Sequence, residues 1–193
     1  MIKGKEVVKR SKKVVFVSFC ILSQSVRAKG VSIRFSAVVD PIVKLLMENN
    51  VNIVQMPCPE LCYEGVLREA VRKDSYDNPE FRSICKEHAN ETIKTLHTML
   101  KGGFQIIGIL GVENSPTCGV NFVFRDGKGR VRESGIFIEE LQQLLMPLEI
   151  KSIPIIGIQV YNIKNSMSEL KNLISKQARL ADFTVDSRKA ECW

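Results

Sequence analysis

The sequence predicts an α/β domain with three layers, Rossmann-like or flavodoxin-like, around a mostly parallel sheet of about four strands. Short runs of Val, Ile and Phe alternate along the chain with longer segments whose apolar residues recur every three or four positions. Strands that alternate with helices in this order form parallel sheets through right-handed crossovers. The 193 residues are enough for one domain with a sizeable buried core.

Each predicted strand is a short apolar run between charged or turn-forming residues, and each predicted helix has apolar residues at helical spacing. The strands are expected at 13–20, 52–56, 104–112 and 153–160. The helices are expected at 35–50, 83–101, 134–146 and 165–180. Between them, 58–82 lacks a clean period and is expected to be irregular with a short helix, and Asp126-Gly127-Lys128-Gly129 indicates a hairpin-like turn within 121–132.

We expect the first strand to be central in the sheet, with the second and third strands on either side of it. That order creates a topological switch point between the first and third strands, where α/β domains bind their ligands. The α/β domain is expected to span 13–180, preceded by a basic leader at 1–12 and followed by a polar tail at 181–193.

The charge and the apolar runs narrow the class of protein. The chain has 28 Lys and Arg against 21 Asp and Glu, a net charge of +7, and a basic surface attracts polyanions such as RNA or nucleotides. A solvated leader and helix face would explain the same excess of basic residues.

No apolar run reaches the roughly 20 residues of a membrane helix, so we expect a cytoplasmic protein without a membrane partner. Six cysteines in that reducing compartment do not indicate a disulfide framework.

Three of these cysteines follow three predicted strands. Cys20 ends the first strand, Cys58 lies two residues after the second, and Cys118 lies in the loop after the third. Since the carboxyl ends of parallel strands share one edge of the sheet, the three thiols are expected to converge. Three thiolates suit either zinc or an iron–sulfur cluster, and three ligands on a cubane leave one iron open. Cys62 is the rival candidate for a fourth ligand.

Two polar residues beside these cysteines are candidates for a catalytic role. Glu60 lies two residues after Cys58, where a carboxylate can serve as a general acid or base, although a surface or capping role would also explain it. Ser115 precedes Cys118 in a proline-containing turn and can orient a bound substrate. A phosphate-binding Gly-rich motif does not follow the first strand, and both histidines, His88 and His97, fall on one predicted helix.

These segments resemble the thiouracil desulfidase family, whose motifs are like S-A-C-L-L-G, C-P-E and S-P-S-C-G in that order. The corresponding segments here are Ser18-Phe19-Cys20-Ile21-Leu22, Cys58-Pro59-Glu60 and Ser115-Pro116-Thr117-Cys118-Gly119. The resemblance covers roughly residues 13–160. The resemblance is to a divergent member of that family, because Arg27-Ala28-Lys29-Gly30 stands where the family often has R-Y-D-G.

The resemblance implies a [4Fe–4S] cluster held by Cys20, Cys58 and Cys118, with Glu60 and Ser115 as the catalytic pair. It implies a hydrolytic desulfidase that replaces the sulfur of thiouracil or thiouridine by oxygen and releases hydrosulfide without net redox change. We further expect Arg27, Thr117 and Asn121 to contact the substrate, which is a small thiolated nucleobase or nucleoside, with thiolated tRNA as a further candidate.

Two other functions remain open from the sequence. The same cluster would suit a sulfur-transfer enzyme acting on tRNA or a small acceptor, and a cluster-bearing or zinc-bearing sensor or binding module would need only the cysteines. A monomer and a homodimer both fit the sequence.

Overall fold

The fold is built on a four-stranded parallel sheet. This computed structural model describes residues 10–31, 34–146 and 153–189, and the side chains through residue 177. The sheet order is β2-β1-β3-β6, formed by β1 (Lys13–Ser18), β2 (Asn52–Met56), β3 (Gln105–Val112) and β6 (Ile155–Ile158). All three pairings are parallel, which confirms the predicted fold class and the central place of the first strand.

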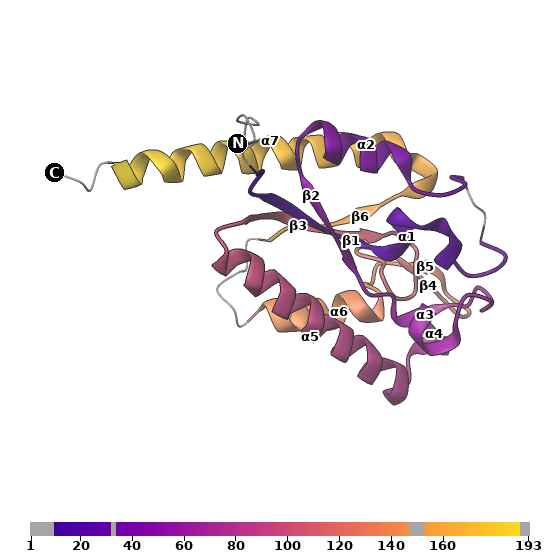
Figure 1. Ribbon diagram of the computed structural model, residues 1–193. Helices are drawn as coiled ribbons and strands as arrows, with labels where there is room; N and C mark the ends of the chain where they lie inside the picture. The colour runs from indigo at the N-terminus through magenta and orange to yellow at the C-terminus, as the bar shows by residue number, and fades with distance from the viewer. Residues whose placement is uncertain (1–9, 32–33, 147–152, 190–193) are drawn as a thin grey trace, which may run out of the picture.

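Helices cover both faces of this sheet and make the three layers visible in Figure 1. On one face lie α5 (Pro79–Lys101) and α6 (Ile136–Leu145), and on the other lie α2 (Asp40–Glu48) and α7 (Ile163–Lys189). Strand β1 is buried on both faces. Val14 and Phe16 join the core beneath α5 and α6, and Val15 and Val17 join the core on the α2 side.

Several helix ends differ from the predicted ones, and the residues at two helix starts explain two of the differences. Helix α2 starts at Asp40, not at 35, because Pro41 in its first turn lacks a backbone N–H and its ring would clash with a carbonyl of a preceding helical turn. Helix α5 starts four residues earlier than predicted, at Pro79, since the side chain of Asn78 accepts a hydrogen bond from the backbone N–H of Phe81. The last helix, α7, continues to Lys189, past the expected end at 180.

The remaining elements gather at the carboxyl end of the sheet (Figure 1). They are α1 (Phe19–Leu22), the 3-10 turns η1 (Gln24–Val26) and η2 (Val160–Asn162), α3 (Pro59–Glu64), α4 (Lys73–Tyr76), and the hairpin of β4 (Val123–Arg125) and β5 (Gly129–Val131). The predicted first strand therefore ends at Ser18, and Cys20 belongs to α1. This end of the domain holds the candidate site.

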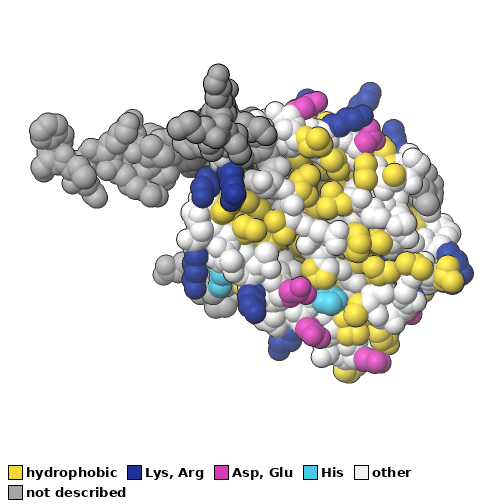
Figure 2. Space-filling view, in the orientation of Figure 1, with side chains coloured by type: hydrophobic (Ala, Val, Ile, Leu, Met, Phe, Trp, Pro, Cys, Tyr) yellow, Lys and Arg dark blue, Asp and Glu magenta, His cyan; other side chains and the backbone are white. Residues whose placement is uncertain are grey.

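The expected boundaries at the chain ends fall partly outside the described residues. Residues 1–9 of the basic leader and 190–193 of the polar tail lie there, so the division at 12 and 180 stays a prediction. Figure 2 shows hydrophobic side chains gathered across the middle of one face, with charged ones mostly toward its edges. Within the described ranges no helix is both long and apolar enough to cross a membrane.

Candidate metal and active site

A cavity of about 580 Å³ opens at the carboxyl edge of the sheet, beside the ends of β1, β2 and β3. Its wall includes all three cysteines singled out from the sequence, Cys20, Cys58 and Cys118. Glu60 and Ser115 lie in the same wall. Five residues from three strand ends are thus brought together, since parallel strands deliver their carboxyl ends to one edge.

The three thiols are partly or fully buried, and the charges of some of them influence the ionisation of others. Burial first, and then the charge of Cys58, raise the pKa of Cys20 to about 12, although Arg27 opposes the shift. Burial and the charges of Cys58 and Cys20 hold the pKa of Cys118 well above its usual value. The pKa of Cys58 is raised as well, first by burial and then by Glu60. Three neighbouring thiols of this kind ionise when a metal centre supplies positive charge.

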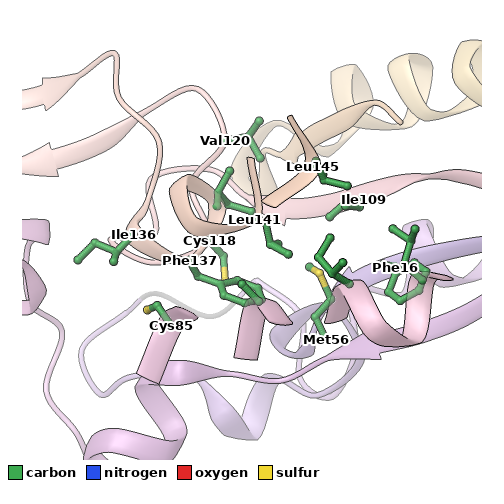
Figure 3. Packing of buried hydrophobic residues seen from close by; sticks show 14 of the residues in the cluster. Phe16, Met56, Cys85, Ile109, Cys118, Val120, Ile136, Phe137, Leu141 and Leu145 are labelled. Atoms are coloured by element: carbon green, nitrogen blue, oxygen red, sulfur yellow. The ribbon is translucent and has the colours of Figure 1, made fainter. Parts of the chain in front are cut away.

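The turn that carries Cys118 is held from several sides. The first backbone N–H groups of α6 donate to this turn: Ile136 to the carbonyl of Pro116 at 3.0 Å and Phe137 to that of Thr117 at 3.1 Å. These bonds satisfy donors that a helix start leaves unpaired. Gly135 permits this contact, because a Cβ there would lie 2.4 Å from the carbonyl oxygen of Thr117. Cys118 itself packs into the core near Phe137 and Leu141 (Figure 3).

Ser115 and Glu60 contact each other across the cavity wall. The Ser115 hydroxyl donates to Oε1 of Glu60 at 3.4 Å and accepts hydrogen bonds from the backbone N–H groups of Thr117 at 3.2 Å and Cys118 at 3.0 Å. This serine therefore stabilises the Cys118 turn and points its proton at the carboxylate. The side chain of Glu60 is 12% exposed, which leaves it accessible from the cavity.

Arg68 completes this arrangement and was not predicted from the sequence. Its side chain is 3% exposed, and its Nε donates to Oε2 of Glu60 at 3.1 Å. The other nitrogens donate to the backbone carbonyls of Gly65 at 2.9 Å and Val26 at 2.6 Å. Arg68 thus joins the end of α3 to the turn η1 and neutralises the partly buried carboxylate of Glu60.

The three residues expected to contact substrate fall in different places. Arg27 lines the cavity, and its Nη1 atom is buried without a hydrogen-bond partner. Thr117 is fully buried within its turn, and Asn121 is exposed, with its side-chain amide donating to Glu113 at 2.7 Å. Neither Thr117 nor Asn121 is part of the described cavity wall, so their contact with substrate stays a prediction.

Two further cysteines among the described residues, Cys62 and Cys85, lie apart from the cavity wall. Cys62 is exposed on α3, which separates this rival ligand from the three cavity thiols. Cys85 is buried in the core on α5 (Figure 3). The sixth cysteine, Cys192, lies outside the described residues.

The chemistry of the donor set suits a thiophilic metal centre. Soft thiolate sulfur selects zinc, copper(I) and iron–sulfur clusters over hard cations. Within the described ranges, no three His, Cys, Asp or Glu side chains meet the spacing required for one metal ion. Ligands of one zinc ion all lie about 2.3 Å from a common centre. The cysteines of an iron–sulfur cluster each bind a different iron. The three cavity thiols share one cavity wall and are of the donor type that such centres take.

Comparisons with known proteins gave two matches. A protein of Methanocaldococcus jannaschii described as uncharacterized protein MJ0003 is 37% identical over 111 residues, which are 58% of this chain and 70% of that protein. A solved structure described as the [4Fe–4S]-dependent thiouracil desulfidase TudS superposes with a TM-score of 0.49 and 18% identity, covering 84% of this chain and 98% of that one. No protein-family model matches the chain.

Proposed function

This chain belongs to the family of the archaeal protein MJ0003, and we propose that it is an iron–sulfur enzyme that removes sulfur from a thiolated pyrimidine. The main support is the meeting of Cys20, Cys58 and Cys118 in the wall of one cavity with Glu60 and Ser115. A binding or sensing module would need the three thiols alone. A carboxylate and a hydroxyl that contact each other beside those thiols favour catalysis.

The three cavity cysteines would hold a [4Fe–4S] cluster, and Cys62, exposed outside the cavity wall, would not be a ligand. When bound, a cluster with one iron lacking a protein ligand supplies a Lewis acid suited to the soft sulfur of a thiocarbonyl group.

Glu60 is proposed as the general base that takes a proton from the attacking water. Its Oε2 is held by Arg68 at 3.1 Å and its Oε1 is contacted by Ser115 at 3.4 Å, so the carboxylate has a fixed orientation at the cavity. Water supplies the oxygen that replaces sulfur, and the sulfur leaves as hydrosulfide. The oxidation state of the carbon is unchanged, and no external reductant or oxidant is required.

Arg27 is proposed to bind the pyrimidine. A buried guanidinium nitrogen without a partner is costly to maintain, and a ligand oxygen would satisfy it. A thiolated pyrimidine that has one carbonyl group in addition to its thiocarbonyl group offers such an oxygen. The same contact would orient the ring with the thiocarbonyl toward the cysteines.

Anaerobic purification and reconstitution test the proposal. We expect a brown protein with broad absorption near about 400 nm and close to four iron and four sulfide per chain. Stoichiometric zinc in a colourless preparation would instead indicate a zinc module. Cys20→Ala is expected to lose the cluster.

Incubation with 4-thiouridine, 2-thiouracil and thiolated tRNA then tests the reaction. Release of sulfide with formation of the oxygen-containing base from at least one of them is expected from the wild type and not from Cys20→Ala. A wild-type cluster that releases sulfide from none of the three would contradict the desulfidase proposal, and a Cys20→Ala variant with a full cluster and full activity would contradict the assigned ligands.

A further inference from the structure

The β4–β5 hairpin has two chemically different faces. Phe124 pairs with Arg130 across the hairpin, so both side chains project from the same face. The Arg130 guanidinium lies 3.6 Å from the centre of the Phe122 ring, which places Phe122 on that face as well. On the opposite face, Val123 is buried and Arg125 forms ion pairs with Asp77 and other carboxylates of the domain.

The outward face, made of Phe122, Phe124 and Arg130 and here termed the hairpin platform, borders the cavity. Phe124 is 40% exposed and is part of the cavity wall. Arg130 is exposed, and its Nε donates at 2.8 Å to the side chain of Asn114, another residue of that wall. Tyr161, 55% exposed, lines the same cavity. Exposed aromatic rings therefore lie at the cavity and on the platform beside it.

Planar aromatic rings and guanidinium groups at a surface suit planar ligands. Successive bases of a single strand stack on aromatic side chains and on arginine planes, whereas the bases of a duplex are already stacked on each other. Positive charge adds attraction for phosphates, and here the net charge is +7. Arg72, half-exposed in the cavity wall, pairs at 3.3 Å with the exposed Asp126. An acidic peptide would match this charge but offers no planar group to stack on the exposed ring of Phe124.

We propose that the hairpin platform binds single-stranded RNA, with bases stacked on Phe124 and on the Arg130–Phe122 pair, and that the thiolated pyrimidine enters the cavity as one nucleotide of that strand. The second half of the proposal rests on the desulfidase function proposed above. The first half, binding of a strand to the platform, stands without any thiolated base or cluster.

The test uses the full chain and a fluorescently labelled oligouridylate of about ten nucleotides without sulfur. Fluorescence anisotropy gives its affinity at several salt concentrations. Phe124→Leu keeps an apolar side chain but removes the ring, and it is expected to weaken binding about tenfold. Two exposed residues of α2 serve as matched controls: Met47→Ala removes an apolar side chain and Lys44→Ala removes a charge, and both are expected to bind like the wild type.

Variants of Arg130 separate stacking from charge. Arg130→Lys keeps the charge and loses the planar group, so affinity is expected to fall while the salt dependence stays unchanged. Arg130→Ala is expected to reduce both affinity and salt dependence.

Wild-type affinity in Phe124→Leu and Arg130→Lys would overturn the proposal, as would equally tight binding of a poly-glutamate of the same length. Iron and sulfide content, with sulfide release from a free thiolated nucleoside, report on the desulfidase separately, so failure of either proposal is recognisable.

Discussion

The hydroxyl of Ser115 donates a hydrogen bond to Oε1 of Glu60 at 3.4 Å, although the two residues lie on different elements and 55 positions apart in the chain. The same hydroxyl accepts bonds from two N–H groups of the turn that carries Cys118. One serine therefore links the proposed base to the loop of a proposed metal ligand, and substitutions at the two residues should have different consequences.

Glu60→Gln is expected to keep the cluster and lose catalysis. Glutamine preserves the size of the side chain but removes the basic oxygen, and loss of a general base typically slows a reaction by about 10² to 10⁴. Sulfide release from the best thiolated substrate, measured alongside iron and sulfide content, checks this expectation. A Glu60→Gln enzyme with wild-type turnover would exclude Glu60 as the base.

Ser115→Ala is expected to lower cluster retention as well as turnover, because two N–H groups of the Cys118 turn lose their acceptor. Loss of iron on gel filtration measures that retention. Ser134→Ala is the matched control, since Ser134 donates to the carbonyl of Val120 at 2.8 Å and is not part of the described cavity wall. Equal iron loss in both variants would show that the effect is not specific to Ser115.

Arg68 and Glu60 should be energetically coupled. Arg68→Ala leaves a carboxylate that is 12% exposed without its cation, and breaking such a pair costs about 3 kcal/mol of unfolding free energy or more. In a Glu60→Gln background the charge is gone, so the same substitution should cost less by about 1 kcal/mol or more. Urea unfolding of the four proteins of this double-mutant cycle, all without cluster, measures the coupling. Additive effects would contradict a direct role of Arg68 in holding Glu60.

Cys62 and the cavity cysteines should respond differently to substitution. Cys62→Ser changes an exposed side chain outside the cavity wall, so cluster content and the absorption near about 400 nm should equal those of the wild type. Cys58→Ser, four residues earlier in the chain, should lose both. Loss of cluster in Cys62→Ser would mean that the site closes around a fourth ligand and would remove the open iron from the proposed function.

The sequence indicated that the first strand lies between the second and third, because apolar runs that alternate with helices form a parallel sheet. It placed the end of the first strand at residue 20, whereas β1 ends at Ser18. Each strand is a short apolar run, and Cys20, Cys58 and Cys118 follow three of these runs. They do line one cavity, and their role as metal ligands stays a prediction. Arg68 was missed because arginine is usually exposed, and nothing in the local sequence marks its burial against Glu60. For the segment that holds α3 and α4 the sequence predicted one short helix without bounds, because six and four residues are too few to show a period.

Acid should weaken the contacts that hold the hairpin to the rest of the domain. Arg125 donates to Glu133 at 2.9 Å and to Asp77 at 3.1 Å, and Lys73, 1% exposed, forms an ion pair with Glu133 at 3.3 Å. The hydrogen bond from Arg125 is the main cause that lowers the pKa of Glu133, although burial opposes it. A carboxylate whose folded pKa is lowered stabilises the protein above its unfolded pKa of about 4.3.

That stabilisation should be lost as the pH falls through the lower folded pKa of Glu133. The thermal unfolding midpoint of the wild type should therefore drop on acidification below about pH 4.3, and Glu133→Gln should flatten this dependence while lowering the midpoint at pH 7. Glu69→Gln is the charge-matched control, because Glu69 is exposed and its ion pair, with the exposed Lys29 at 3.5 Å, is solvated. Equal pH dependence in the wild type and in Glu133→Gln would show that this ion-pair cluster does not contribute to acid sensitivity.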